Sequence, residues 1–232
     1  MNLTFWHSSC NMASIGSCLP NIAVDSTGFG ENYGSRYYYH RLDDFGQKKL
    51  LSQRRFMKHS IAIDTDNQAV IASINRQSRR HDNIYFKPLM EKCNELVKIH
   101  NVTADMGYDA ESNHVLVREK LGGVSIIPIR TTSFNVGVHT LKTKYRKMLS
   151  RRFPLDKYHQ RSKIETVNFV EKRKFGSDLQ SRITRLRRRE LKVIDVVYNI
   201  YRYMKLNFAP VIGFLQGFLS ILRLYHVYCT MQ

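Results

Sequence analysis

Short apolar runs that stop at turn-forming residues fill the first half of the chain, and they predict β-strands. The first of these runs ends at Asp25 and precedes the turn-prone sequence Ser-Thr-Gly. Two later runs are separated only by residues 65–68, which predicts a hairpin that accounts for Asp64 and Asp66 as turn residues. The predicted strands lie at 21–24, 36–41, 60–64, 69–74, 102–104 and 124–129.

Apolar positions at helical spacing predict helices between and after these strands. The first begins at His81-Asp82-Asn83, and a second runs from about 110, with Asp109 as its N-cap, to Gly122-Gly123. Two more are predicted at 156–175, ending at Gly176, and at 181–205. Strands alternating with helices predict an α/β fold, a mixed sheet flanked by helices, with a basic helical region at its C-terminal end.

Composition narrows the class of partner. The 232 residues, 43% of them hydrophobic, can build one folded domain. The formal net charge is +18 and the pI about 9.9, which favours a polyanion such as nucleic acid over a small metabolite. The four cysteines form no CxxC pair, which argues against a disulfide scaffold or zinc ribbon and for a reducing cytosol.

The chain has no sequence signal for secretion or membrane insertion. Its first 20 residues lack the basic start and continuous apolar run of a signal peptide. The apolar stretch at 208–222 is interrupted by Pro210 and Gln216 and is short for a bilayer span. We therefore expect no membrane partner.

Positive charge gathers in the second half of the chain. Residues 142–192 hold 18 Lys and Arg against 5 Asp and Glu, a net +13 of the chain's +18. The sequence Arg-Leu-Arg-Arg-Arg-Glu-Leu-Lys lies within this region, where Arg185, Arg188 and Arg189 predict contacts with a DNA backbone. An ordinary solvated helix face is the alternative interpretation.

Three acids occupy positions that suit a metal site on a sheet. Asp25 and Asp105 each follow an apolar strand, and Glu165 lies in the basic helix predicted at 156–175. Carboxylates from neighbouring strands and a covering helix can converge on divalent cations, and such oxygen ligands suit Mg²⁺ or Mn²⁺. Taken alone, Asp25 could instead cap the turn that follows it. The same alternative applies to Asp105, and Asp109 is a nearby candidate for either role.

The helix around Glu165 carries a line of groups suited to phosphodiester chemistry. Tyr158, Arg161, Glu165 and Lys172 fall within an arc of about 60° on the predicted helix. The carboxylate can hold a metal while the neighbouring guanidinium and ammonium groups contact phosphate oxygens. An exposed helix laced with salt bridges is the alternative.

The spacing Tyr158-x2-Arg161-x3-Glu165-x6-Lys172 resembles the signature of DDE transposases of insertion sequences, in the branch defined by a Tyr-Arg-Glu-Lys helix. The resemblance extends to the residues around both aspartates and to the start of the first predicted helix. These matching segments are 23–29, 81–83 and 103–109, and the resemblance covers roughly 23–204.

The resemblance implies a ribonuclease-H-like catalytic domain, placed at 20–204, with a two-metal site made by Asp25, Asp105 and Glu165. It implies that Tyr158, Arg161 and Lys172 bind phosphates at the transposon end, and that the protein cuts this end and joins it to target DNA. Double-stranded DNA, a homodimer on that DNA and a prokaryotic cytoplasm follow as expectations.

Two features differ from that family's pattern. Only 24 residues precede Asp25, with no helix-turn-helix among them, and the segment 205–232 is apolar and nearly uncharged. We expect an irregular N-terminal tail at 1–19, an apolar C-terminal tail at 205–232 and a truncated copy of the gene. The alternative function is therefore a catalytically inactive transposase that binds only DNA or an intact transposase.

Overall fold

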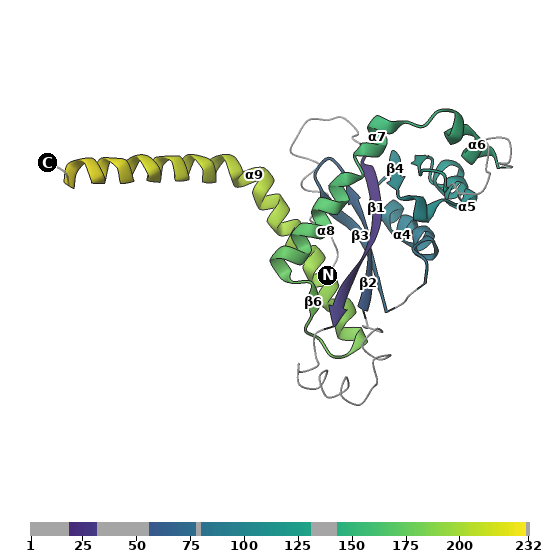
Figure 1. The fold of residues 1–232 in the computed structure, drawn as a ribbon, viewed down its shortest axis with the longest axis horizontal. Helices are drawn as coiled ribbons and strands as arrows, with labels where there is room; N and C mark the ends of the chain where they lie inside the picture. The colour runs from purple at the N-terminus through teal and green to yellow at the C-terminus, as the bar shows by residue number, and fades with distance from the viewer. Residues whose placement is uncertain (1–18, 32–55, 78–79, 131–142, 231–232) are drawn as a thin grey trace, which may run out of the picture.

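A six-stranded mixed sheet forms the centre of the protein (Figure 1). The computed structural model describes residues 19–31, 56–77, 80–130 and 143–230. The strand order is β3-β2-β1-β4-β5, and a short strand, β6, pairs with the far end of β1. The strands are β1 (Asn21–Glu31), β2 (Phe56–Asp64), β3 (Ala69–Arg76), β4 (Asn101–Ala104), β5 (Val124–Ile126) and β6 (Asp178–Leu179).

Strand direction changes at β1. The strands β1, β2 and β3 are antiparallel neighbours, whereas β1, β4 and β5 run parallel. The predicted hairpin at 65–68 is confirmed, and Asp64 accepts hydrogen bonds there from the Asp66 amide at 3.0 Å and the Asn67 side chain at 2.7 Å. This order confirms the mixed α/β sheet that the sequence predicts, and it agrees with the ribonuclease-H-like fold that the family resemblance implies. The strand expected at 36–41 lies outside the described residues, as does nearly all of the expected tail at 1–19.

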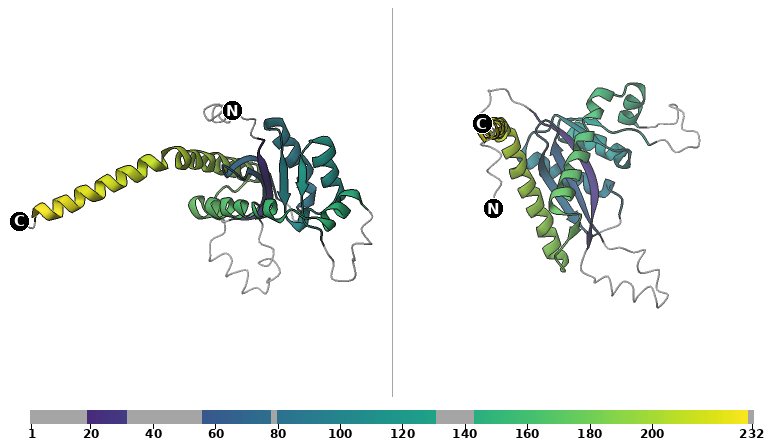
Figure 2. Two further views of the ribbon diagram at one scale, coloured as in Figure 1. Left: turned by 90° about the horizontal axis from the view of Figure 1, so that it is seen from above. Right: turned by 60° about the vertical axis from the view of Figure 1, so that its left-hand side comes forward.

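Helices cover both faces of the sheet, which is seen edge-on in Figure 2. On one face, α4 packs Phe86, Leu89 and Met90 against Val24 and Val102. On the other, α8 and α9 bury Ile164, Val167 and Tyr198 against the sheet. The helices are α4 (Asn83–Leu96), α5 (Glu111–Val115), α6 (Lys144–Arg151), α7 (Leu155–His159), α8 (Ser162–Phe175) and α9 (Thr184–Thr230), with a 3-10 turn η1 (Met106–Tyr108) and a π-helical turn η2 (Leu116–Lys120).

The single helix predicted at 156–175 is wrong, because the structure has two. The chain turns between α7 and α8 through short-range hydrogen bonds, among them the Arg161 amide to the Tyr158 carbonyl at 2.9 Å. None of the residues of α7, all of them described, is buried, whereas α8 buries Ile164 and Val167. The turn lets α8 lie on the sheet while α7 stays at the surface. The predicted end at Gly176 is confirmed, and its φ of 95° is one that glycine adopts without strain.

Two further details differ from expectation. The N-cap of α5 is Ala110, so Asp109 is not the cap. Its carboxylate instead accepts two hydrogen bonds from the Arg146 guanidinium, at 3.0 and 2.8 Å, and one from the Arg130 amide at 2.8 Å. The last helix also runs past the predicted end at 205, because α9 continues to Thr230 and projects away from the sheet (Figure 1). Within the described residues, none of the helices combines the length and apolarity needed to cross a membrane.

Candidate active site

Asp25 and Asp105 lie next to each other on neighbouring parallel strands. Val24 of β1 pairs with Ala104 of β4, and the two aspartates are the following residues. Val24 and Ala104 belong to the core under α4, so the alternation of side chains places both aspartates on the opposite face, the face covered by α8.

The expectation that Asp25 ends a strand is wrong. Strand β1 continues to Glu31, because β2 pairs with it as far as Gly30. The neighbour on its other side does end here, since β4 stops at Ala104. Asp25 therefore lies just past the point where β4 stops pairing with β1, and its side chain is partly exposed there.

The two carboxyl groups have different surroundings. Asp105 accepts the Met106 amide at 2.7 Å and so begins the turn η1. Asp25 accepts a hydrogen bond from the Asn168 side chain at 3.2 Å. Burial raises the pKa of Asp25 above its usual value, and the negative charge of Asp105 adds to this effect, while the Ser26 amide and Arg161 oppose it. Such a pair favours a bound cation, because a cation offsets the charge that burial disfavours.

Glu165 lies in the first turn of α8, the helix that packs on this face of the sheet. Its side chain is 58% exposed and its Oε1 accepts a hydrogen bond from Arg161 at 2.7 Å. Burial lowers the pKa of Arg161, but Tyr158, Glu165 and both aspartates together raise it above its usual value. The Arg161 guanidinium therefore lies in the electrostatic field of all three predicted acids.

The three acids act electrostatically on Arg161 but do not meet at one point. Among the described residues, the structure brings one group of three acidic or histidine ligands within 4.8 Å of one another, and it consists of His59, Glu171 and Asp195. The Glu165 carboxylate instead turns toward Arg161.

The line of groups predicted on the helix continues along β1. Lys172 donates a hydrogen bond to the Thr27 hydroxyl, and its Nζ lies 5.5 Å from the centre of the Phe29 ring. Tyr158 belongs to α7, but its ring is still 5.9 Å from the Arg161 guanidinium. Asn168 was missed by the sequence reasoning, although it follows Glu165 by three residues and so shares this helix face.

The arginines at the start of α9 have two different roles. Arg185 and Arg189 are exposed and Arg188 is partly buried. Arg187, from the same run, is buried and donates hydrogen bonds to the carbonyl oxygens of Ser181 at 2.9 Å and Arg182 at 2.5 Å. This arginine stabilises the start of the helix, while its neighbours leave positive charge at the surface.

The structure thus defines an α/β domain with two aspartates on adjacent parallel strands, a covering helix that carries a glutamate, and basic side chains beside them. The chain belongs to the transposase DDE domain family, whose model matches residues 16–199.

Comparison with solved structures finds similarity to a piggyBac transposase synaptic complex with hairpin DNA, determined by cryo-electron microscopy. That chain is 11% identical, with a TM-score of 0.33, over 56% of this chain and 27% of the other. The matched region thus spans about a quarter of the transposase's length. Comparison with curated proteins gives no match.

Proposed function

We propose that this protein is a metal-dependent DNA transposase that cuts at transposon ends and joins them to target DNA. The observation that carries the proposal is the register of β1 and β4, which places Asp25 beside Asp105 under α8. The order Tyr158, Arg161, Glu165 and Lys172 supports the insertion-sequence branch of the family, and membership of the transposase DDE domain family supports the chemistry.

The acids suit two divalent cations, Mg²⁺ or Mn²⁺. Asp25, Asp105 and Glu165 offer only carboxylate oxygens, and the raised pKa of Asp25 indicates a carboxyl group that gains from a nearby cation. Bound metals would supply activation of water or a DNA 3′-hydroxyl and stabilisation of the leaving oxygen in an in-line displacement. Glu165 would exchange its ion pair with Arg161 for such a contact, which frees the guanidinium for a phosphate oxygen.

The remaining basic groups would position the DNA. Arg161 and Lys172 lie along one face of α8, with Tyr158 beside Arg161, and together they form a line that can follow a phosphate backbone. Arg185, Arg188 and Arg189 at the start of α9 extend this positive surface. Binding that rests on such contacts should weaken steeply as salt rises.

Substitution of Glu165 by Gln tests the catalytic assignment. Glu91→Gln is a matched control, because Glu91 is also an exposed helical glutamate in an i,i+4 ion pair, with Lys87 at 3.8 Å. We expect Glu165→Gln to reduce Mg²⁺- or Mn²⁺-dependent breaks in a plasmid carrying the gene and its native flanks by at least about two orders of magnitude. The control should cleave like wild type.

DNA affinity separates catalysis from a structural role. Glu165→Gln should keep salt-sensitive binding, whereas Lys172→Ala should lower the slope of log affinity against log salt by about 0.9 for each phosphate group that the variant no longer neutralises. If wild type binds DNA yet makes no metal-dependent breaks, the protein is the inactive transposase of the alternative function. Loss of binding and cleavage together in Glu165→Gln would refute its assignment as a metal ligand.

We also propose that the protein acts as a homodimer on DNA. Apolar side chains are exposed at heptad spacing on α9, with Leu186 at 40%, Val193 at 58% and Ile200 at 52% exposure. Two such stripes can pair as a coiled coil. Val193→Glu should therefore shift the sedimentation of the protein from dimer to monomer. A wild-type protein that is monomeric both free and on DNA would refute the dimer.

A further inference from the structure

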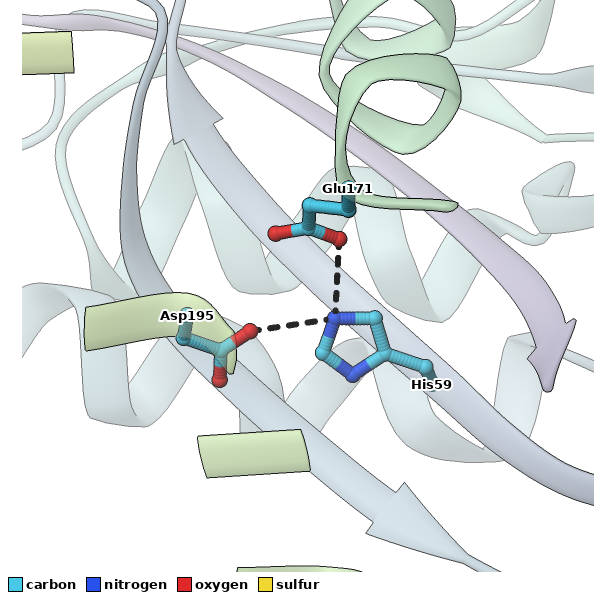
Figure 3. A group of neighbouring side chains, drawn as sticks. All are labelled: His59, Glu171 and Asp195. Atoms are coloured by element: carbon cyan, nitrogen blue, oxygen red, sulfur yellow. Dashed lines mark ion pairs between the residues drawn. The ribbon is translucent and has the colours of Figure 1, made fainter. Parts of the chain in front are cut away.

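Three titratable side chains meet in the core between the sheet and the helices α8 and α9 (Figure 3). His59 comes from β2, Glu171 from α8 and Asp195 from α9. The His59 Nε2 lies 3.5 Å from the Glu171 Oε2 and 3.1 Å from the Asp195 Oδ1. The first two residues are 0% exposed and Asp195 is 8% exposed, so bulk solvent does not reach the cluster.

Four atoms of this cluster are buried without a hydrogen-bond partner in the described structure. They are His59 Nε2, both oxygens of Glu171, and Asp195 Oδ1. A proton on Nε2 can serve only one of the three oxygens well, so at least two oxygens would remain unsatisfied. An unsatisfied buried carboxylate oxygen is costly, which indicates that a further group belongs between these atoms.

The other polar atoms of the same side chains are already occupied. The Nδ1 of His59 donates to the Asn75 Oδ1 at 2.6 Å, and the Oδ2 of Asp195 accepts from the Ser73 hydroxyl at 2.5 Å. With its proton held at Nδ1, a neutral imidazole directs the lone pair of Nε2 toward both carboxylates. Outer hydrogen bonds of this kind orient the ligands of metal sites in proteins.

We propose that His59, Glu171 and Asp195 form a buried structural site for one divalent transition-metal ion, most suitably Zn²⁺. Bonds of 2.0–2.1 Å in a tetrahedron place neighbouring ligand atoms about 3.3 Å apart, close to the 3.1 and 3.5 Å between these atoms. The His59 Nε2, one Glu171 oxygen and the Asp195 Oδ1 supply three of the four positions, and the second Glu171 oxygen can share the position of the first as a bidentate ligand. Two carboxylates and a neutral imidazole also balance the charge of a divalent ion.

In the metal-free cluster, a proton on the His59 Nε2 occupies the position that a metal ion would take. Burial lowers the pKa of His59, but Asp195 and Glu171 more than offset this effect and raise it to about 10. Burial likewise raises the pKa of Glu171. A metal ion would displace the Nε2 proton and interact with all four donor atoms at once.

The site is separate from the acids of the proposed active site. Glu171 follows Glu165 by six residues on α8, about 9 Å along the helix axis, and points into the core whereas Glu165 is exposed. A metal ion here would join β2, α8 and α9, and so hold the helix that carries Glu165 against the sheet.

Metal content of the full-length protein, purified without a metal-affinity step, tests the proposal. After incubation with Zn²⁺ and removal of free metal, we expect one Zn²⁺ per chain in wild type. Glu171→Gln keeps the size of the side chain and should lose the ion, while Asp25→Asn, a matched control from the other acidic site, should keep it. Zn²⁺ should also raise the melting temperature of wild type and of Asp25→Asn by several degrees.

Substitution of Co²⁺ for Zn²⁺ keeps the test decisive if Glu171→Gln fails to fold, because wild type and Asp25→Asn alone then give the answer. Both should show the intense visible absorption of four-coordinate Co²⁺. A wild-type protein that retains no metal and has an unchanged melting temperature overturns the proposal, and the cluster is then an imidazolium with two carboxylates. An ion retained by wild type and lost in Asp25→Asn also overturns it, because that ion occupies the other acidic site.

Discussion

The two aspartates at the β1–β4 junction should make the metal-free protein less stable than a variant that lacks one of them. Burial and the neighbouring Asp105 raise the pKa of Asp25, so its ionised form opposes folding. We expect Asp25→Asn to unfold at a higher temperature than wild type when divalent cations are removed. The substituted side chain keeps an oxygen for the Ser26 amide. Its amino group can donate to the Asn168 Oδ1, which is buried without a partner in the described structure, once the Asn168 amide turns over.

The magnitude follows from the spacing of the strands. Neighbouring strands lie about 4.8 Å apart, so two carboxylates on them repel by about 1–3 kcal/mol, depending on the effective dielectric. Arg161 opposes this repulsion with a larger effect on Asp25, so burial of the carboxylate supplies the net cost of ionising it. A gain of about 1–2 kcal/mol remains, which corresponds to about 2–8 °C in melting temperature for a chain of this length.

The dependence on pH has a definite sign. A raised pKa means that the folded state binds the Asp25 proton more tightly than the unfolded state does, so wild type loses stability as pH rises through that pKa. The advantage of Asp25→Asn should therefore be largest near neutral pH and disappear toward pH 4. Thermal unfolding followed by circular dichroism in EDTA, at several pH values, measures this difference.

Mg²⁺ and Mn²⁺ supply the second half of the test. Either ion should raise the melting temperature of wild type and leave that of Asp25→Asn nearly unchanged. Asp156→Asn makes the same chemical change at an exposed residue of α7 and should behave like wild type throughout. A less stable Asp25→Asn in EDTA would refute the electrostatic argument, and an equal response of both proteins to Mg²⁺ and Mn²⁺ would refute the assignment of Asp25 as a ligand.

Other predictions concern residues outside the acidic sites. Asp109→Asn should lower the free energy of unfolding by about 2–4 kcal/mol at pH 7, because it leaves Arg146 without its charged partner. The loss measured by urea denaturation should shrink as the pH falls below 3.8, the usual pKa of Asp, and then through the lowered pKa of folded Asp109. Gly176→Ala should cost about 1–3 kcal/mol, since φ there is 95°. Gly107→Ala has open space around its Cβ and no positive φ, so an equal loss of stability in both glycine variants would contradict this explanation.

The strands were predictable because each is built on an apolar run that can be recognised locally in the sequence. Apolar runs at 60–64 and 69–74 with a polar turn between them define a hairpin wherever it lies in the fold. The length of β1 was not predictable in this way, because residues after Asp25 become a strand only by pairing with β2, a segment far along the chain. The placement of Asp25 in mid-strand is therefore a property of the sheet.

The helices, too, were predictable only in the features that local spacing determines. The spacing from Arg161 to Lys172 predicted one face of α8, and the contacts of Lys172 with Thr27 and of Arg161 with Glu165 lie along that face. The break before α8 depends on which residues reach the sheet, a fact that helical spacing alone does not contain. The same is true of His59, Glu171 and Asp195, which are separated in sequence and meet only when three elements pack together.

The position of α8 links the buried cluster to the proposed chemistry. Successive residues of a helix are about 100° apart, so a shift of α8 by one residue would turn Glu165 away from the aspartates and Glu171 away from the core. Apolar contacts of Ile164 and Val167 alone tolerate small displacements, whereas Glu171 is buried within 3.5 Å of His59 and so fixes the rotation of the helix. The helix that supplies the exposed glutamate is thus positioned by the buried one, and the geometry of the acidic site depends on a contact in the core of the fold.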